Sequence, residues 1–197
     1  MKYDSRTFGH AEAIFNILGG DEAVGRILRG ELEVKVTEKV VVPSPPILAL
    51  FATFELPARA EKLVVADEFV VGKHGIKYVD PSFTRAFGNL TEEPSEGGTF
   101  ASSTLSRAAS VAEMSQERGS KATTMLGDAL AQMDKQSQGQ EGPLLMNGWA
   151  NIFECKDAAG NSFAVLVFWS ADRGGWVVYC YGVAIRGYDG RRFFPRN

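Results

Sequence analysis

Arginines and aromatic residues alternate near the end of the chain, and this combination could bind a partner. Guanidinium groups clamp phosphates, and aromatic rings stack on bases. The same residue types also dominate the hot spots of protein–protein interfaces. A simpler interpretation is a terminal segment that is held by its aromatic rings while its arginines reach solvent. The candidate binding residues are Trp149, Tyr179, Tyr181, Arg186, Arg191 and Arg192.

Residues suited to catalysis or metal binding are sparse. The two histidines, His10 and His74, stand far apart in the sequence. Zinc sites and activated nucleophiles usually need clustered His, Cys or carboxylate partners. Cys155, next to Lys156, is the best candidate for a nucleophile, but a small apolar side chain in a strand is the simpler interpretation. We therefore predict no catalytic residue, no metal and no cofactor.

The segment GDEAVG at 20–25 has the outer glycine spacing of a phosphate-binding loop. Arg26 and Ile27 follow it where such a loop requires Lys and then Ser or Thr. The segment also lacks the set of basic residues with which a helix-turn-helix reads DNA, because only Arg26 and Arg29 qualify. A corner between two helices is the better explanation.

Glu92, Glu93 and Glu96 form an acidic cluster that could bind a divalent cation or supply carboxylates for acid–base chemistry. Charged residues between Pro and Gly more often belong to a solvated loop. We predict such a loop, with mobility, over 89–98.

The composition is that of an ordinary globular protein, with 45% hydrophobic and 23% charged residues. A net charge of -3 argues against a strongly basic nucleic-acid binder, although a local basic patch is compatible with it. The first residues contain no apolar core of a secretory signal, and the longest apolar runs, 47–54 and 176–185, are shorter than the ~20 residues of a membrane span. These features predict a cytoplasmic protein without a membrane segment.

The clearest structural signal lies at 146–185, where three runs rich in Val, Ile, Phe, Trp and Tyr are separated by Gly, Asn and Asp. This pattern predicts a three-stranded antiparallel meander. Residues 163–169 are apolar at both parities, so the middle strand is expected to be central and covered on both faces.

Other periodicities predict the remaining elements. Glycines 19 and 20 separate two helical patterns, the second capped by Asp21. Alternation predicts a strand at 32–42 and an apolar strand at 47–56, and a hairpin is expected over 63–79. Pro81–Phe87 should form a short helix capped by Asp80, with Phe83 and Phe87 on one face.

A longer helix is predicted at 120–136, with Ser120 as its cap. Its apolar stripe would contain Met125, Leu126, Leu130 and Met133. Asp128, Gln132 and Lys135 are expected to point away from that stripe. The pattern over 99–119 fits helix and strand equally well.

Together these elements predict an α+β fold in a single domain over 1–197. It comprises an N-terminal helical hairpin (1–31), strands and a short helix (32–90), a flexible polar segment (91–119), and the main helix with the meander (120–197). The sheet should be antiparallel or mixed, with about six to seven strands and the main helix packed on one face.

Several pieces of the chain carry a family resemblance: ILGGDEAVGRILRGE, EKLVVADEFVVG, TMLGDALAQMDKQ and GPLLMNGWANIFECKDAAGNSFAV. They are similar to an uncharacterised family of small proteins from candidate-phylum (Parcubacteria-type) bacteria. Glu154-Cys155 and the basic tail after Gly187 depart from that pattern. The resemblance implies a shared architecture and carries no activity, substrate or catalytic residue.

Three hypotheses for the function follow from these observations. The first is a non-catalytic binding or interaction protein that uses the arginine and aromatic residues to hold a partner, which could be another protein. The second is a nucleic-acid-associated protein that uses the same residues. The third is a small enzyme in which Cys155 is the nucleophile.

Overall fold

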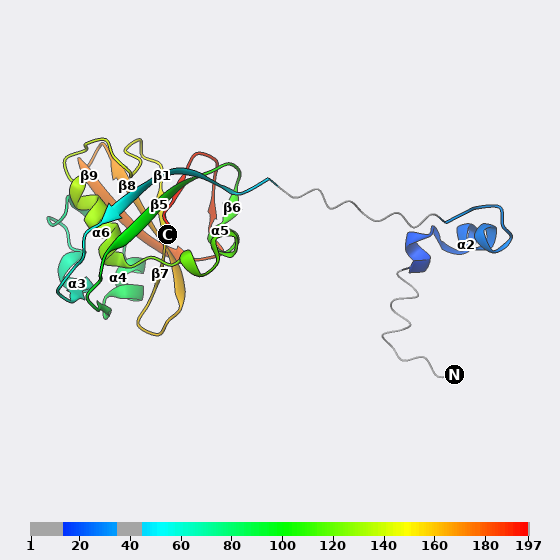
Figure 1. The fold of residues 1–197 in the computed structure, drawn as a ribbon, viewed down its shortest axis with the longest axis horizontal. Coiled ribbons are helices and arrows are strands. Elements are labelled where there is room, and N and C mark those ends of the chain that lie inside the picture. Colours follow the sequence, from blue (N-terminus) through cyan, green and yellow to red (C-terminus); the bar gives the residue numbers. More distant parts are fainter. Residues whose placement is uncertain (1–13, 35–44, 197) are drawn as a thin grey trace. The chain divides into compact units, whose positions relative to one another are not determined.

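The computed structural model describes residues 14–34 and 45–196 of the chain (Figure 1). The chain divides into two compact units, 1–44 and 45–197, and each is described by itself. The prediction of a single domain over the whole chain stays a prediction. Most of the strand predicted at 32–42 lies outside the described residues.

The first unit contains the predicted pair of helices. Residues 14–17 are helical, and α2 (Gly20–Leu28) follows after a turn at residues 18 and 19. Gly19 and Gly20 have positive φ angles of 96° and 75°, a conformation that glycine adopts without strain. Gly19, not the predicted Asp21, precedes the first helical residue, and Asp21 lies in the first turn, where a carboxylate suits the helix dipole.

A seven-stranded mixed sheet forms the second unit. Its strands lie in the order β1 (Leu48–Leu56), β5 (Gly98–Leu105), β11 (Arg192–Phe193), β7 (Asn151–Lys156), β8 (Ser162–Ser170), β9 (Gly175–Gly182) and β3 (Ile76–Val79). The predicted meander is confirmed, because β7, β8 and β9 pair antiparallel in sequence order. The sheet is mixed because β11 runs parallel to β7, and β3 runs parallel to β9.

Short elements complete the unit. Two small sheets pair β2 (Leu63–Val64) with β4 (Thr91–Glu92), and β6 (Ala109–Ser110) with β10 (Arg186–Gly187). The helices are α3 (Val65–Glu68), α4 (Pro81–Phe87), α5 (Val111–Arg118) and α6 (Leu126–Lys135), with a 3₁₀ turn, η1 (Gly119–Lys121), before α6.

The two faces of the sheet carry separate cores. On one face, α3, α4 and α6 share a core with the sheet, and its buried residues include Phe87, Phe153 and Trp176. On the other, α5 packs over a smaller cluster that includes Ile152 and Phe193. Figure 1 shows α3, α4 and α6 gathered on one side of the sheet, with α5 apart from them. The predicted packing of helix on sheet is therefore confirmed.

The hairpin predicted over 63–79 is wrong. Residues Val65–Glu68 form the short helix α3. The chain from 63 to 71 is therefore not the continuous strand that the predicted hairpin needs. β2 then pairs with β4, while β3 pairs with β9 from the meander. Both partners are distant in sequence, and alternation along a strand does not specify its neighbour.

For the helices α4 and α6, one prediction is confirmed and two are wrong. Pro81–Phe87 is helical and the Asp80 carboxylate accepts a hydrogen bond from Ser82 N, as predicted. The main helix begins at Leu126 instead of near Ser120. Residues before it bind β7: Thr124 N donates to Glu154 O at 2.7 Å. Asp128 and Gln132, expected to point away from the apolar stripe, are buried.

The segment predicted to be flexible and polar at 91–119 contains β4, β5, β6 and α5. β5 pairs with β1 on one side and with the C-terminal β11 on the other. Ser110 caps α5 in a capping box with Glu113. The pattern over 99–119 fits helix and strand equally well in the sequence. Several of its serines and alanines are in fact strand residues of β5, inside the sheet.

Candidate functional site: an aromatic face with arginines

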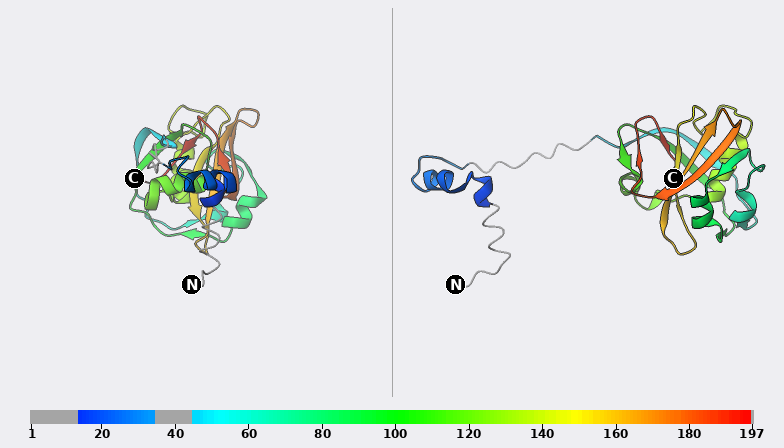
Figure 2. Two further views of the ribbon diagram at one scale, coloured as in Figure 1. Left: turned by 90° about the vertical axis from the view of Figure 1, so that its right-hand side faces the viewer. Right: turned by 180° about the vertical axis from the view of Figure 1, so that it is seen from behind.

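Tyr179 and Tyr181 lie on the sheet face opposite α3, α4 and α6. Along β9, Trp176, Val178 and Cys180 belong to the larger core, so the alternating side chains point to the other face. In the antiparallel register Tyr179 stands opposite Leu166 of β8. The β8–β9 hairpin, drawn in orange, is seen from behind in the right-hand view of Figure 2.

Four aromatic rings from three adjacent strands form a cluster on this face, with Tyr179 next to each of the other three. The rings of Phe168 and Tyr179 have centroids 5.7 Å apart and lie within 9° of parallel. Tyr179 and Tyr181 are 6.1 Å apart and within 16° of parallel. Tyr78 of β3 lies 5.7 Å from Tyr179. We call Tyr78, Phe168, Tyr179 and Tyr181 the aromatic face.

Two of these rings are absent from the sequence-based candidates. Phe168 alternates onto this face of β8, so the parity of the meander strands could have identified it. Tyr78 joins the cluster only because β3 pairs with β9 in parallel, across a large sequence separation. No periodicity within 76–79 carries that information.

A shallow pocket of about 290 Å³ opens beside the rings. Its lining comprises Gly148, Ala150, Leu166, Phe168, Tyr179, Tyr181 and Arg191. The structure therefore brings together Tyr179, Tyr181 and Arg191 from the sequence-based candidates. The Arg191 guanidinium also lies 5.0 Å from the centroid of the exposed Tyr188 ring, a cation–π geometry.

A second arginine borders the aromatic face at Tyr78. The guanidinium of Arg173, from the β8–β9 turn, lies 5.1 Å from the Tyr78 ring centroid. The Tyr78 hydroxyl donates to Asp80 Oδ2 at 3.1 Å, and this hydrogen bond to a carboxylate raises the pKa of Tyr78. The Asp80 pKa is lowered, mainly by the hydrogen bonds from Ser82. The Tyr78 ring is thus held in place by the hydrogen bond of its hydroxyl.

Trp149 is half-exposed. In the sequence it stands between Gly148 and Ala150, which both line the pocket. Its ring rests against Gly190, which has a positive φ of 80°. A Cβ at position 190 would overlap with that ring. The glycine therefore fixes the Trp149 ring against the loop that carries Arg191.

Replacing Gly190 with alanine should displace the Trp149 ring and lower stability by about 2 kcal/mol, through the ring overlap and the positive φ together. Gly160→Ala is a matched control, because Gly160 has a φ of 85° and nothing within 4 Å of its added Cβ. Acrylamide quenching of tryptophan fluorescence should increase in Gly190→Ala and stay unchanged in Gly160→Ala. Equal effects in the two variants would show that the ring does not rest on Gly190.

Arg192 and Arg186 lie away from this pocket. Arg192 borders a different pocket, where its guanidinium lies 3.8 Å from the Phe51 ring centroid and donates to Pro143 O at 2.6 Å. Arg186 donates to Ala108 O at 3.3 Å, next to the β6–β10 pair. Since Phe193 and Phe194 are buried in opposite cores, the C-terminal segment is anchored by its aromatic rings, as the simplest interpretation predicted.

The prediction of a solvated acidic loop is wrong for Glu92, which points inward, whereas Glu93 and Glu96 are exposed. Its carboxylate oxygens accept hydrogen bonds from Leu126 N at 2.6 Å and Gly127 N at 2.9 Å, at the start of α6. Arg59 lies 3.3 Å from the same group. Burial outweighs these contacts and raises the Glu92 pKa.

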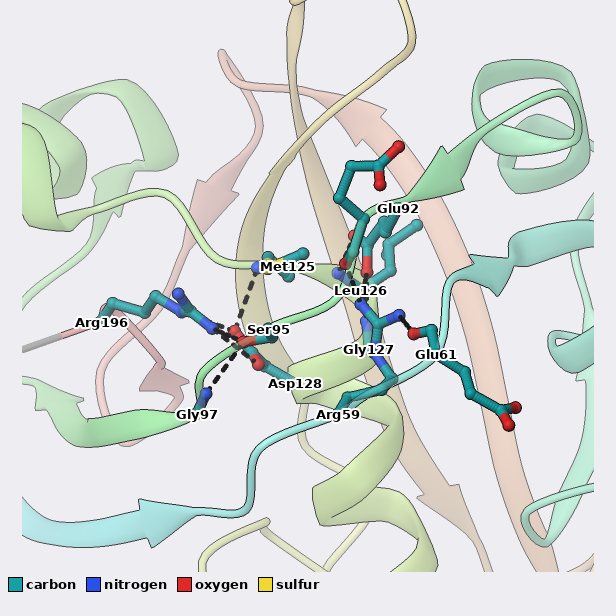
Figure 3. A network of polar contacts seen from close by, with 11 residues as sticks. Arg59, Glu61, Glu92, Ser95, Gly97, Met125, Leu126, Gly127, Asp128 and Arg196 are labelled. Atoms are coloured by element: carbon teal, nitrogen blue, oxygen red, sulfur yellow. Dashed lines mark hydrogen bonds and ion pairs between the residues drawn. The ribbon is translucent and has the colours of Figure 1, made fainter.

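A second ion pair completes this network. Arg196 binds both oxygens of the Asp128 carboxylate, at 2.7 Å and 3.0 Å, and also donates to Ser95 Oγ. Figure 3 shows Arg59 and Arg196 approaching the start of α6 from opposite sides. Each buried carboxylate thus has protein partners, so the network joins four distant segments and offers no open ligand position. Among the described residues, no group of His, Cys, Asp and Glu could hold a metal ion.

The described histidine and both cysteines are poorly placed for nucleophilic catalysis. Nδ1 of His74 lies 2.7 Å from Asp134 Oδ1, and its Nε2 lies 2.8 Å from Glu68 Oε2. Both ring nitrogens are therefore occupied by carboxylates. Cys155 and Cys180 are buried, and burial raises the pKa of Cys155 well above its usual value and that of Cys180 to about 11. His10 lies outside the described residues.

Neither cysteine should react with iodoacetamide in the folded protein near neutral pH, because a buried thiol with a raised pKa is not ionised. Mass spectrometry of the intact protein should show no adduct before unfolding and two adducts after unfolding in urea. Rapid labelling of Cys155 alone under native conditions would contradict the structure and revive the enzyme hypothesis.

No protein-family model, curated protein or solved structure matches this chain. The resemblance to a candidate-phylum bacterial family accordingly stays a prediction. In the described part of the chain, no helix is both long and apolar enough to cross a membrane.

Proposed function

We propose that this chain is a non-catalytic cytoplasmic binding protein and that it holds its partner on the aromatic face. The observation that carries the proposal is that Tyr179, Tyr181 and Arg191 line one pocket. Partly exposed aromatic and arginine side chains are the residues that contribute most to binding energy at interfaces. Here they come from separate segments and are held by a rigid sheet.

The position of these residues also suits binding. Tyr181 is 43% exposed although it lies on a strand of the central meander. Its neighbours Val178 and Cys180 are buried, so the strand itself is fixed. A binding side chain on a rigid strand loses little backbone freedom when a partner is captured, which favours affinity.

Affinity isolation with two single variants tests this proposal. Tyr181→Ala removes an exposed ring from the aromatic face. Phe51→Ala is the matched control, because Phe51 is 57% exposed on β1 and borders a different pocket. Molecules retained by the wild-type chain, both proteins and nucleic acids, should be lost with Tyr181→Ala and kept with Phe51→Ala.

Retention that is the same for all three proteins would overturn the proposal. Loss with Phe51→Ala alone would move the binding surface to the pocket beside Arg192. Unchanged circular dichroism and thermal unfolding midpoints in both variants serve as the check that the fold is intact.

A further inference from the structure

We infer that the aromatic face is a stacking platform for single-stranded nucleic acid. The inference rests on the proposed function, since it names the partner that the same surface would hold. It uses Tyr78, Phe168, Tyr179 and Tyr181, with Arg173 and Arg191 beside them.

The arrangement of the rings suits an unstacked base. Neighbouring ring centroids on the face are 5.7 Å to 6.1 Å apart. Phe168, Tyr179 and Tyr181 are stacked on one another, and the guanidinium of Arg173 lies over Tyr78. The ring open to a base is therefore Tyr181, which is 43% exposed. A base on this ring must leave its own stack, which a single strand allows and a duplex resists. Recognition of single strands by rings on a sheet is an established mode of binding, in which a π-face accepts any base.

Two arginines lie at the cluster of rings. Arg173 is exposed and its guanidinium lies over the Tyr78 ring. Arg191 is half-buried in the pocket with Tyr179 and Tyr181. The phosphates of a strand whose bases lie on the rings would come within reach of both guanidinium groups, which bind phosphate with charge-assisted hydrogen bonds. A phosphate can use these hydrogen bonds, whereas an uncharged proline-rich peptide, the other ligand that aromatic surfaces commonly take, cannot.

The nearby carboxylates limit the electrostatic part of the affinity. Asp80 is engaged by Tyr78 and Ser82. Asp172 and Asp189 are exposed in the same loops as the two arginines. The net charge of the chain is -3. Stacking should therefore contribute more than phosphate contacts, and binding should depend on salt only as strongly as about two neutralised phosphates require.

The first experiment is a titration of a fluorescein-labelled, single-stranded oligouridine of about ten nucleotides, a length within the site size of known stacking proteins. Fluorescence anisotropy should show saturable binding by the full chain. Tyr181→Ala should raise Kd by about 5- to 150-fold, the usual effect of removing one stacking ring. Tyr181→Phe keeps the ring and should bind like the wild type, whereas Tyr181→Leu, apolar without a π-face, should bind like Tyr181→Ala.

The second experiment measures Kd between about 50 mM and 200 mM salt. The slope of log K against log salt should be about -1.4 for the wild type and about -0.7 for Arg173→Ala, since each phosphate contact on a single strand contributes about -0.7. Lys62→Ala makes the same change in charge and serves as the control. Lys62 borders a pocket lined by α3 and β2 residues, so its variant should keep the wild-type slope.

Two outcomes would overturn the inference, and they are distinguishable from failure of the proposed function. If a labelled proline-rich peptide binds in a Tyr181-dependent manner and the oligonucleotide does not, the aromatic face is a peptide site and the proposed function stands. If the oligonucleotide binds equally to wild type and Tyr181→Ala, its site lies elsewhere. If Tyr181→Ala also leaves affinity isolation unchanged, both proposals fail.

Discussion

Trp176→Ala is expected to destabilise the second unit by about 4 kcal/mol, the largest effect of any single truncation considered. Trp176 is fully buried under α6. Its ring packs edge-on against the ring of Trp169, with the two centroids 5.2 Å apart. Its indole N–H donates to Met133 O at 3.1 Å. Truncation of a large aromatic residue in a core costs about 3–5 kcal/mol, because the lost transfer free energy adds to the cost of a cavity.

Urea unfolding followed by circular dichroism measures this effect. Trp149→Ala is the control, since Trp149 is half-exposed and should cost only about 1 kcal/mol. Trp176→Phe should fall between the two, because it keeps most of the apolar volume and leaves a buried carbonyl with one hydrogen bond fewer. A cost below about 1 kcal/mol for Trp176→Ala would mean that α6 does not cover this residue.

Arg196→Ala is expected to cost about 2–3 kcal/mol, although Arg196 is the penultimate residue of the chain. It leaves the Asp128 carboxylate, whose side chain is only 7% exposed, without its cation. Breaking a buried ion pair costs about 3–5 kcal/mol, and we expect less here because the Arg196 side chain is 32% exposed and partly screened.

A double-mutant cycle in urea isolates this interaction. Asp128→Ala with Arg196→Ala should be less destabilising than the sum of the single variants by at least about 1 kcal/mol, because the second substitution removes a group that has already lost its partner. Arg196→Lys keeps the charge but loses the two-pronged geometry, so it should recover only part of the stability. Additive single effects would show that the two side chains do not pair in solution.

The meander and the cap of α4 were predictable because their signals are local. Turn residues and alternation define β7, β8 and β9, and Asp80 with Pro81 marks a helix start without reference to the rest of the fold. The aromatic face is only partly local. Tyr179 and Tyr181 follow from the parity of β9, whereas Tyr78 joins them through a parallel pairing that no local pattern specifies.

Long-range pairing also explains the other failures. β11 enters the sheet between β5 and β7, so the basic tail is divided among a core strand, the aromatic face and the network at α6. Adjacent residues of an extended strand point to opposite faces. Arg191 and Arg192 therefore reach different pockets, although the sequence suggests one patch. Glu92 and Asp128 lie inside the fold because arginines and backbone amides distant in sequence offset part of the cost of burial.

Cross-linking by ultraviolet light tests most directly whether the aromatic face holds single-stranded nucleic acid. The full chain would be irradiated with oligouridine at low salt, digested and analysed by mass spectrometry for peptides that carry a uridine adduct. We predict adducts on Tyr179 or Tyr181 and on the peptide that contains Tyr78, with loss of the β9 adducts in Tyr181→Ala. Adducts confined to β1, to α6 or to the first unit, or no adducts at all, would contradict the account.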